Sequence, residues 1–133
     1  MSAKPRLLVI TNNHFDLTWR RCWDRRFTWQ GRTYASYSEL EQWYMEENLA
    51  LAAADPAYRF EAESVAVLRQ FLRRCPQRRT EVAALIKSGR FGVAGAGDNI
   101  VDAVMILGES LVRNFTHSLA WLEREFAIRP VLG

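Results

Sequence analysis

Apolar and polar positions alternate in blocks along this chain, and the blocks predict strands and helices in turn. The apolar run at residues 7–10 (LLVI) is bounded by polar residues, which is typical of a strand buried on both faces in a parallel sheet. Short segments at 58–60 and 91–94 predict further strands, and 128–132 predicts the entry to another. The basic, aromatic and aperiodic segment 20–37 predicts a loop.

Between the predicted strands, apolar residues recur at helical spacing. This pattern predicts helices over 38–54, 63–74, 80–87 and 110–126. The first opens on Ser38, with Glu41 three positions on as in a capping box, and Pro56 follows its end. Gly89 suits the left-handed cap of the third. The positions expected to be buried are Leu40, Trp43, Tyr44 and Leu51 in the first helix, Val65, Leu68, Phe71 and Leu72 in the second, and Leu111, Phe115, Leu119, Leu122 and Phe126 in the last. Strands that alternate with helices favour an α/β fold with a parallel sheet or barrel.

Composition narrows the class of protein. The 133 residues are 49% hydrophobic and 25% charged, enough apolar content for a globular core. The net charge of +3 is carried mainly by Arg, interleaved with Asp and Glu and without a nucleic-acid-binding motif, so we expect no nucleic-acid partner. Cys22 and Cys75 make no disulfide framework, and no apolar run has signal-peptide or membrane-spanning length. These features predict a soluble cytoplasmic protein with no membrane partner.

The first candidate site follows the first predicted strand. His14 and Asp16 lie two residues apart, and in extended backbone such residues point to the same side. A His nitrogen and a carboxylate oxygen suit Zn²⁺, which then needs further ligands from elsewhere. Trp19 offers a flat apolar face to a sugar ring. The alternative is a solvated loop, since a lone His-x-Asp is common.

The second candidate site is a loop with the helix start that follows it. Asp102 either holds a substrate hydroxyl or caps a turn. Gly108 and Glu109 predict a helix N-terminus, where an acidic side chain is favourable. The simplest interpretation of this helix start is a cap in which the acidic side chain forms a buried pair with an arginine. His117 lies near the boundary of the apolar face and is expected to be packed or half-exposed rather than a ligand.

Taken in order, these segments resemble glycoside hydrolase family 38. The signature His-x-Asp-x-x-Trp is His14-Phe15-Asp16-Leu17-Thr18-Trp19, and a Gly-Arg leading into a short strand is found at 89–95. Asp102 stands six residues ahead of Gly-Glu-Ser-Leu-Val-Arg at 108–113. The match is colinear over nearly the whole chain. The resemblance implies that residues 1–133 are the N-terminal portion of a family 38 catalytic domain, a partial parallel β/α barrel-like domain that ends before the nucleophile.

The same resemblance implies a zinc-dependent retaining α-mannosidase that hydrolyses terminal α-mannosides of glycans. His14 and Asp16 would then be two zinc ligands, while Trp19 and Asp102 would line the mannose pocket. Glu109 would help to organise the loop and helix. The nucleophile and the acid/base are expected beyond residue 133, so no catalytic residue is assigned here and the chain alone is expected to be inactive.

Three positions depart from the family pattern. The chain has Asn12 where His is frequent, Asp98 where Trp is common, and Ala127 in place of Gly. Two alternatives therefore stay open: another metal-dependent carbohydrate hydrolase such as a deacetylase, and a non-catalytic carbohydrate- or protein-binding relic. An unfinished sheet edge would also favour self-association into homo-oligomers.

Overall fold

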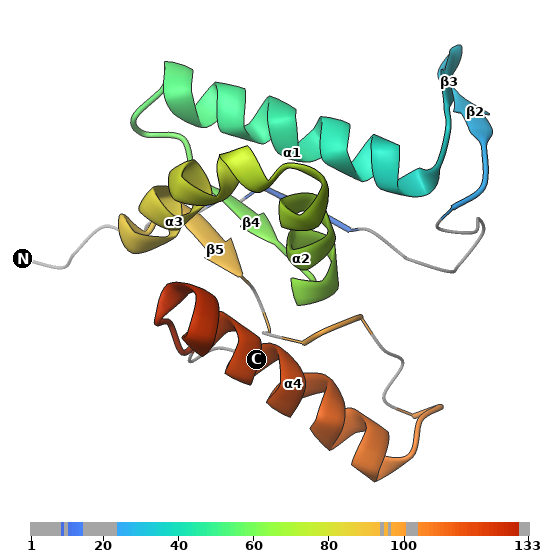
Figure 1. Ribbon diagram of the computed structural model, residues 1–133, viewed down its shortest axis with the longest axis vertical. Coiled ribbons are helices and arrows are strands. Elements are labelled where there is room, and N and C mark those ends of the chain that lie inside the picture. Colours follow the sequence, from blue (N-terminus) through green and yellow to red (C-terminus); the bar gives the residue numbers. More distant parts are fainter. Residues whose placement is uncertain are drawn as a thin grey trace, which may run out of the picture.

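A computed structural model describes residue 9 and residues 11–14, 24–93, 95, 97–100 and 104–130 of the chain. In chain order its elements are β1 (Thr11–Asn13), β2 (Phe27–Trp29), β3 (Arg32–Tyr34), α1 (Tyr37–Ala54), β4 (Phe60–Ala62), α2 (Val65–Arg74), the 3-10 helix η1 (Pro76–Arg78), α3 (Arg79–Lys87), β5 (Phe91–Val93) and α4 (Gly108–Phe126) (Figure 1). The α/β class expected from the sequence is confirmed.

The main sheet has three parallel strands in the order β1-β4-β5, which is also their order along the chain. Asn13 pairs with Ala62, and Ala62 pairs with Val93, so the carboxyl ends of the three strands lie level. Parallel crossovers are right-handed as a rule, and crossovers of one hand that always advance in one direction place the connecting helices on one face of a sheet. The described strands do not close into a barrel, so the barrel-like part of the expectation stays a prediction.

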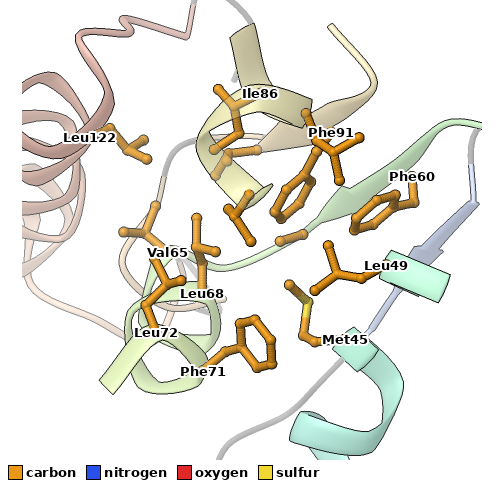
Figure 2. Packing of buried hydrophobic residues seen from close by; sticks show 14 of the residues in the cluster. Met45, Leu49, Phe60, Val65, Leu68, Phe71, Leu72, Ile86, Phe91 and Leu122 are labelled. Atoms are coloured by element: carbon orange, nitrogen blue, oxygen red, sulfur yellow. The ribbon is translucent and has the colours of Figure 1, made fainter. Parts of the chain in front are cut away.

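One hydrophobic core joins this sheet to its helices. Figure 2 shows Met45 and Leu49 of α1 packed near Phe60 and Phe91 of the sheet, with α2 and α3 contributing beside them. The rings of Phe60 and Phe91 stack at 4.4 Å between centroids. Leu122 of α4 is fully buried in the same cluster. The four positions predicted to be buried in α2 are all confirmed as buried: Val65, Leu68, Phe71 and Leu72.

Of the strand predicted at residues 7–10, the structure describes only Val9, which is 80% exposed and not part of a strand. Residues 7, 8 and 10 lie outside the described residues. Among the described residues, β1 begins at Thr11, which lies opposite Phe60, the first residue of β4. The second predicted strand begins at Phe60 rather than residue 58, and 128–130 are not a strand.

The segment 20–37 is not simply a loop, because its described residues include the β2–β3 hairpin. A two-residue turn at Gln30 and Gly31 joins the strands, and both residues have positive φ angles of 50° and 77°. Such a turn matches the twist of a hairpin. Phe27 and Tyr34 are buried against each other, with ring centroids 5.3 Å apart.

The N-cap of helix α1 lies two residues earlier than predicted. The cap is Ser36, whose Oγ accepts a hydrogen bond from the Glu39 N–H at 3.3 Å. Ser38 and Glu41 are instead buried against α2. Leu51 is 49% exposed rather than buried as expected, because the buried face of α1 runs through Met45, Leu49 and Ala52. None of the helices in the described part of the chain is long and apolar enough to cross a membrane.

Candidate functional site

The site is built where two neighbouring strands end. His14 directly follows β1 and Glu63 directly follows β4, and the strands are parallel and paired. The Nδ1 atom of His14 lies 2.8 Å from Glu63 Oε2 and 3.0 Å from Oε1. The His14 side chain is 59% exposed, whereas that of Glu63 is 26% exposed. The His14 imidazole is therefore accessible, and its Nδ1 atom contacts the Glu63 carboxylate at the carboxyl edge of the sheet.

Strand alternation also turns the Glu61 side chain away from the core. Phe60 and Ala62 of β4 are buried in the core, so Glu61 between them faces the opposite side of the sheet. Its neighbour on β5 is Gly92. A Cβ atom at that position would lie 3.0 Å from Glu61 Oε1, so glycine leaves the room that this carboxylate occupies.

The loop after β5 is tied to the start of α2. The N–H of Val65 donates to the carbonyl of Gly97 at 3.0 Å, and Ser64 Oγ donates to the carbonyl of Asp98 at 2.7 Å. The Asp98 carboxylate accepts from Arg69 Nη2 at 2.6 and 2.8 Å. Asp98, a departure from the family pattern, thus anchors this loop through an ion pair and backbone contacts.

The loop is also fixed to α4 by an asparagine. Asn114 accepts at Oδ1 from the Asn99 N–H and donates from Nδ2 to the Asn99 carbonyl. The backbone N–H of Asp98 donates to the carbonyl of Asn114 at 2.9 Å. The segment that leads to the predicted substrate residue Asp102 is therefore held from both α2 and α4.

Of the predicted site residues, the structure describes only His14. Asp16, Trp19 and Asp102 lie outside the described residues, so the expected pairing of His14 with Asp16 stays a prediction. Glu63 was missed, because it was assigned to the first turn of a helix that begins only at Val65. The available signal was an acidic residue at the end of a strand that neighbours the His14 strand.

One expectation about α4 is corrected. Glu109 does pair with Arg113 at 2.7 Å, but the side chains are 74% and 65% exposed, so the pair is not buried. It bridges successive turns of the first part of the helix, on its solvent side. His117, which the sequence predicts to be packed or half-exposed, is exposed.

The described residues fit one side of a zinc site. A His that donates from Nδ1 to a carboxylate is the usual environment of a zinc-ligating imidazole, and His14 has this environment. Among the described residues, no group of three or more His, Cys, Asp or Glu side chains could hold a metal by itself. The remaining ligands would have to come from Asp16 and from elsewhere.

A separate pocket of about 260 Å³ lies between the hairpin, α1 and the end of α2. Its lining residues are Arg32, Glu39, Gln42, Trp43, Glu46 and Arg74. The carboxylate of Glu39 accepts from the Ala35 N–H, and that of Glu46 pairs with Arg78. His14, the one predicted site residue that the structure describes, does not line this pocket.

One known protein family matches nearly the whole chain. The family described as "Glycosyl hydrolases family 38 N-terminal domain" matches residues 4–133 of the chain. Among curated proteins, none matches the chain significantly.

Proposed function

This chain belongs to glycosyl hydrolase family 38, and from that premise we propose that it forms part of a zinc-dependent α-mannosidase. The proposed substrates are terminal α-mannosides of glycans, hydrolysed with retention of anomeric configuration. The observation that carries the proposal is the accessible His14 imidazole, held by Glu63 at the carboxyl ends of two parallel strands. Ligand sites of α/β proteins gather at such edges.

In this proposal His14 and Asp16 hold the metal. Zinc, when bound, would coordinate sugar hydroxyls and so help to orient the ring. Trp19 would cover the apolar face of the sugar, and Asp102 would accept a hydrogen bond from a sugar hydroxyl. The anchored loop at 97–99 supports this role, because it restricts where the backbone leading to Asp102 can lie.

Retention requires two carboxyl groups about 5–5.5 Å apart, one as nucleophile and one as acid and then base. We assign neither role to a residue of this chain.

The metal is tested by the zinc content and zinc affinity of the purified chain. His14→Ala and Asp16→Ala are expected to lose zinc, while His117→Ala, which removes an exposed histidine on α4, is expected to keep it. Zinc retained in both site variants would show that the metal had been placed wrongly.

The reaction is tested with an aryl α-mannoside on the enzyme of which this chain is proposed to form part, and on the 133-residue chain alone. Release of the α-anomer of mannose, followed by NMR, is expected from the whole enzyme. No turnover is expected from the chain alone, because no catalytic carboxyl group is assigned to it. Activity on acetylated sugars instead would favour the deacetylase alternative. Metal-independent glycan binding without turnover would favour a binding relic.

A further inference from the structure

The His14–Glu63 contact joins residues that are 49 positions apart in the chain. The register of β1 and β4 ends on the pair Asn13 and Ala62, so His14 and Glu63 are the next residues beyond it on each strand. Their contact therefore follows from the parallel pairing of the sheet. It does not depend on a flexible local turn.

A carboxylate only accepts hydrogen bonds, so the His14 nitrogen that meets Glu63 must carry a hydrogen. With its proton on Nδ1, a neutral imidazole has its lone pair on Nε2. Metal-bound histidines are commonly oriented in this way by a carboxylate at the second ring nitrogen. The contact thus selects which His14 atom can bind a metal.

The backbone around Glu63 is held independently of any metal. Ala62 before it is fully buried in β4, and Ser64 after it is 1% exposed. Ser64 donates to the Asp98 carbonyl, and the N–H of Ala66 donates to the same carbonyl at 2.8 Å. The Glu63 carboxylate is accordingly pre-positioned before the metal arrives.

We propose that Glu63 is a positioning residue that orients the His14 ring and selects Nε2 as its metal-binding atom. This inference rests on the proposed function, since it needs His14 to be a metal ligand. The nearby Glu61 has the same chemistry but lies against Gly92, and no such role is assigned to it.

The test measures Zn²⁺ affinity by competition with a chromophoric chelator in the wild type, Glu63→Gln, Glu63→Ala and the control Glu61→Gln. Loss of an outer carboxylate typically weakens metal binding about 10–100-fold. We expect a loss in this range for Glu63→Ala and a smaller loss for Glu63→Gln, whose amide oxygen still accepts from Nδ1. Glu61→Gln is expected to stay within about twofold of the wild type. Circular dichroism and melting curves check that each variant folds.

A second measurement reads the His14 tautomer directly by ¹H–¹⁵N NMR of the metal-free protein. The chain has two histidines, so His14→Ala identifies the signals and His117 is an internal reference. We expect the Nδ1–H form in the wild type and loss of that preference in Glu63→Ala. If Glu63→Ala binds zinc through His14 with the wild-type affinity and keeps the wild-type tautomer, the role of Glu63 is overturned and the proposed metal site still stands. Absence of His14-dependent zinc binding in the wild type would overturn the proposed metal site and this role with it.

Discussion

Glu41 on α1 is 0% exposed, and neither of its carboxylate oxygens has a hydrogen-bond partner among the residues that the structure describes. Burial raises the pKa of this carboxyl well above its ordinary value, and the nearby Arg74 guanidinium opposes the shift. Arg74 itself donates to Gln42 and Ser38. A buried polar group without a partner costs about 1–3 kcal/mol, so Glu41 destabilises the α1–α2 contact.

Replacing this residue should therefore stabilise the protein. We expect Glu41→Met to raise the free energy of unfolding at pH 7 by about 1–3 kcal/mol, as measured by urea denaturation. The matched control is Glu47→Met, which removes an exposed carboxylate from the same helix and should change little. A destabilised Glu41→Met protein would show that the carboxyl makes a favourable contact.

The pH dependence has a definite sign. The folded state keeps the Glu41 proton to higher pH than the unfolded state does, so stability falls as pH rises. The fall begins near the ordinary Glu pKa of about 4.3 and continues up to the raised pKa, at about 1.4 kcal/mol per pH unit. The advantage of Glu41→Met over the wild type should accordingly grow as pH rises through this window. An advantage independent of pH would contradict the raised pKa.

Cys75 is a second buried titratable residue, 2% exposed at the end of α2. Burial, and then the Glu46 carboxylate, raise the pKa of its thiol. Because the thiolate is the reactive form, we expect Cys75 to react with a thiol reagent only when the protein unfolds. A Cys22→Ser variant, in which Cys75 is the remaining thiol, allows this rate to be followed against urea concentration. Fast labelling without urea would mean that this end of α2 opens in the native state.

At the scale of elements, the Asp98–Arg69 pair joins the loop after β5 to α2, and Arg69 lies over the Trp121 ring of α4 at 6.0 Å. Both charged side chains are about a quarter to a third exposed, at 26% and 30%. A double-mutant cycle with Asp98→Ala and Arg69→Ala should give a coupling energy of about 1 kcal/mol.

The control cycle uses the exposed pair of Glu109 and Arg113 within α4. Exposed pairs of this spacing contribute about 0.3–0.5 kcal/mol. Equal coupling energies in the two cycles would mean that the Asp98–Arg69 pair stabilises the protein no more than a solvated surface pair. The backbone hydrogen bonds alone would then anchor the loop after β5.

The ends of helices could be predicted from the sequence where a single residue carried the signal. Gly89 has the predicted left-handed conformation, with φ of 68°, because the chain must turn there between α3 and β5. The start of α1 was ambiguous, because Ser36 and Ser38 are each followed by Glu three positions on. Burial of Ser38 against α2 decides between them, and a capping pattern holds no information about burial.

The site was only partly predictable for a related reason. His14 was found from a short motif that follows a strand. Glu63 lies 49 residues away and meets His14 only through the register of two strands. Each of these strands has three residues, too few for a periodic pattern to fix which residue stands last at the edge.

At the scale of the whole molecule, the described residues form two hydrophobic clusters of unequal size. The larger joins the parallel sheet to α1, α2, α3 and α4. The smaller attaches the hairpin to α1 and α2, and its buried members are Phe27, Tyr34, Leu40 and Val67. The hairpin is therefore held at the N-terminal end of α1 by a small contact area (Figure 1), and such peripheral units open before the global transition.

This division predicts different effects from removing one side chain in each cluster. Leu122→Ala empties a fully buried position in the larger cluster and should cost about 2–5 kcal/mol of global stability. It should accelerate amide hydrogen exchange throughout β4 and β5. Phe27→Ala should accelerate exchange in β2 and β3, yet leave β4 and β5 protected. Equal acceleration of β4 and β5 by both substitutions would mean that the hairpin and the parallel sheet unfold as one unit. Zinc binding provides an independent check, because His14 and Glu63 lie at the edge of the parallel sheet. Near the unfolding transition, Leu122→Ala should weaken zinc binding and Phe27→Ala should not.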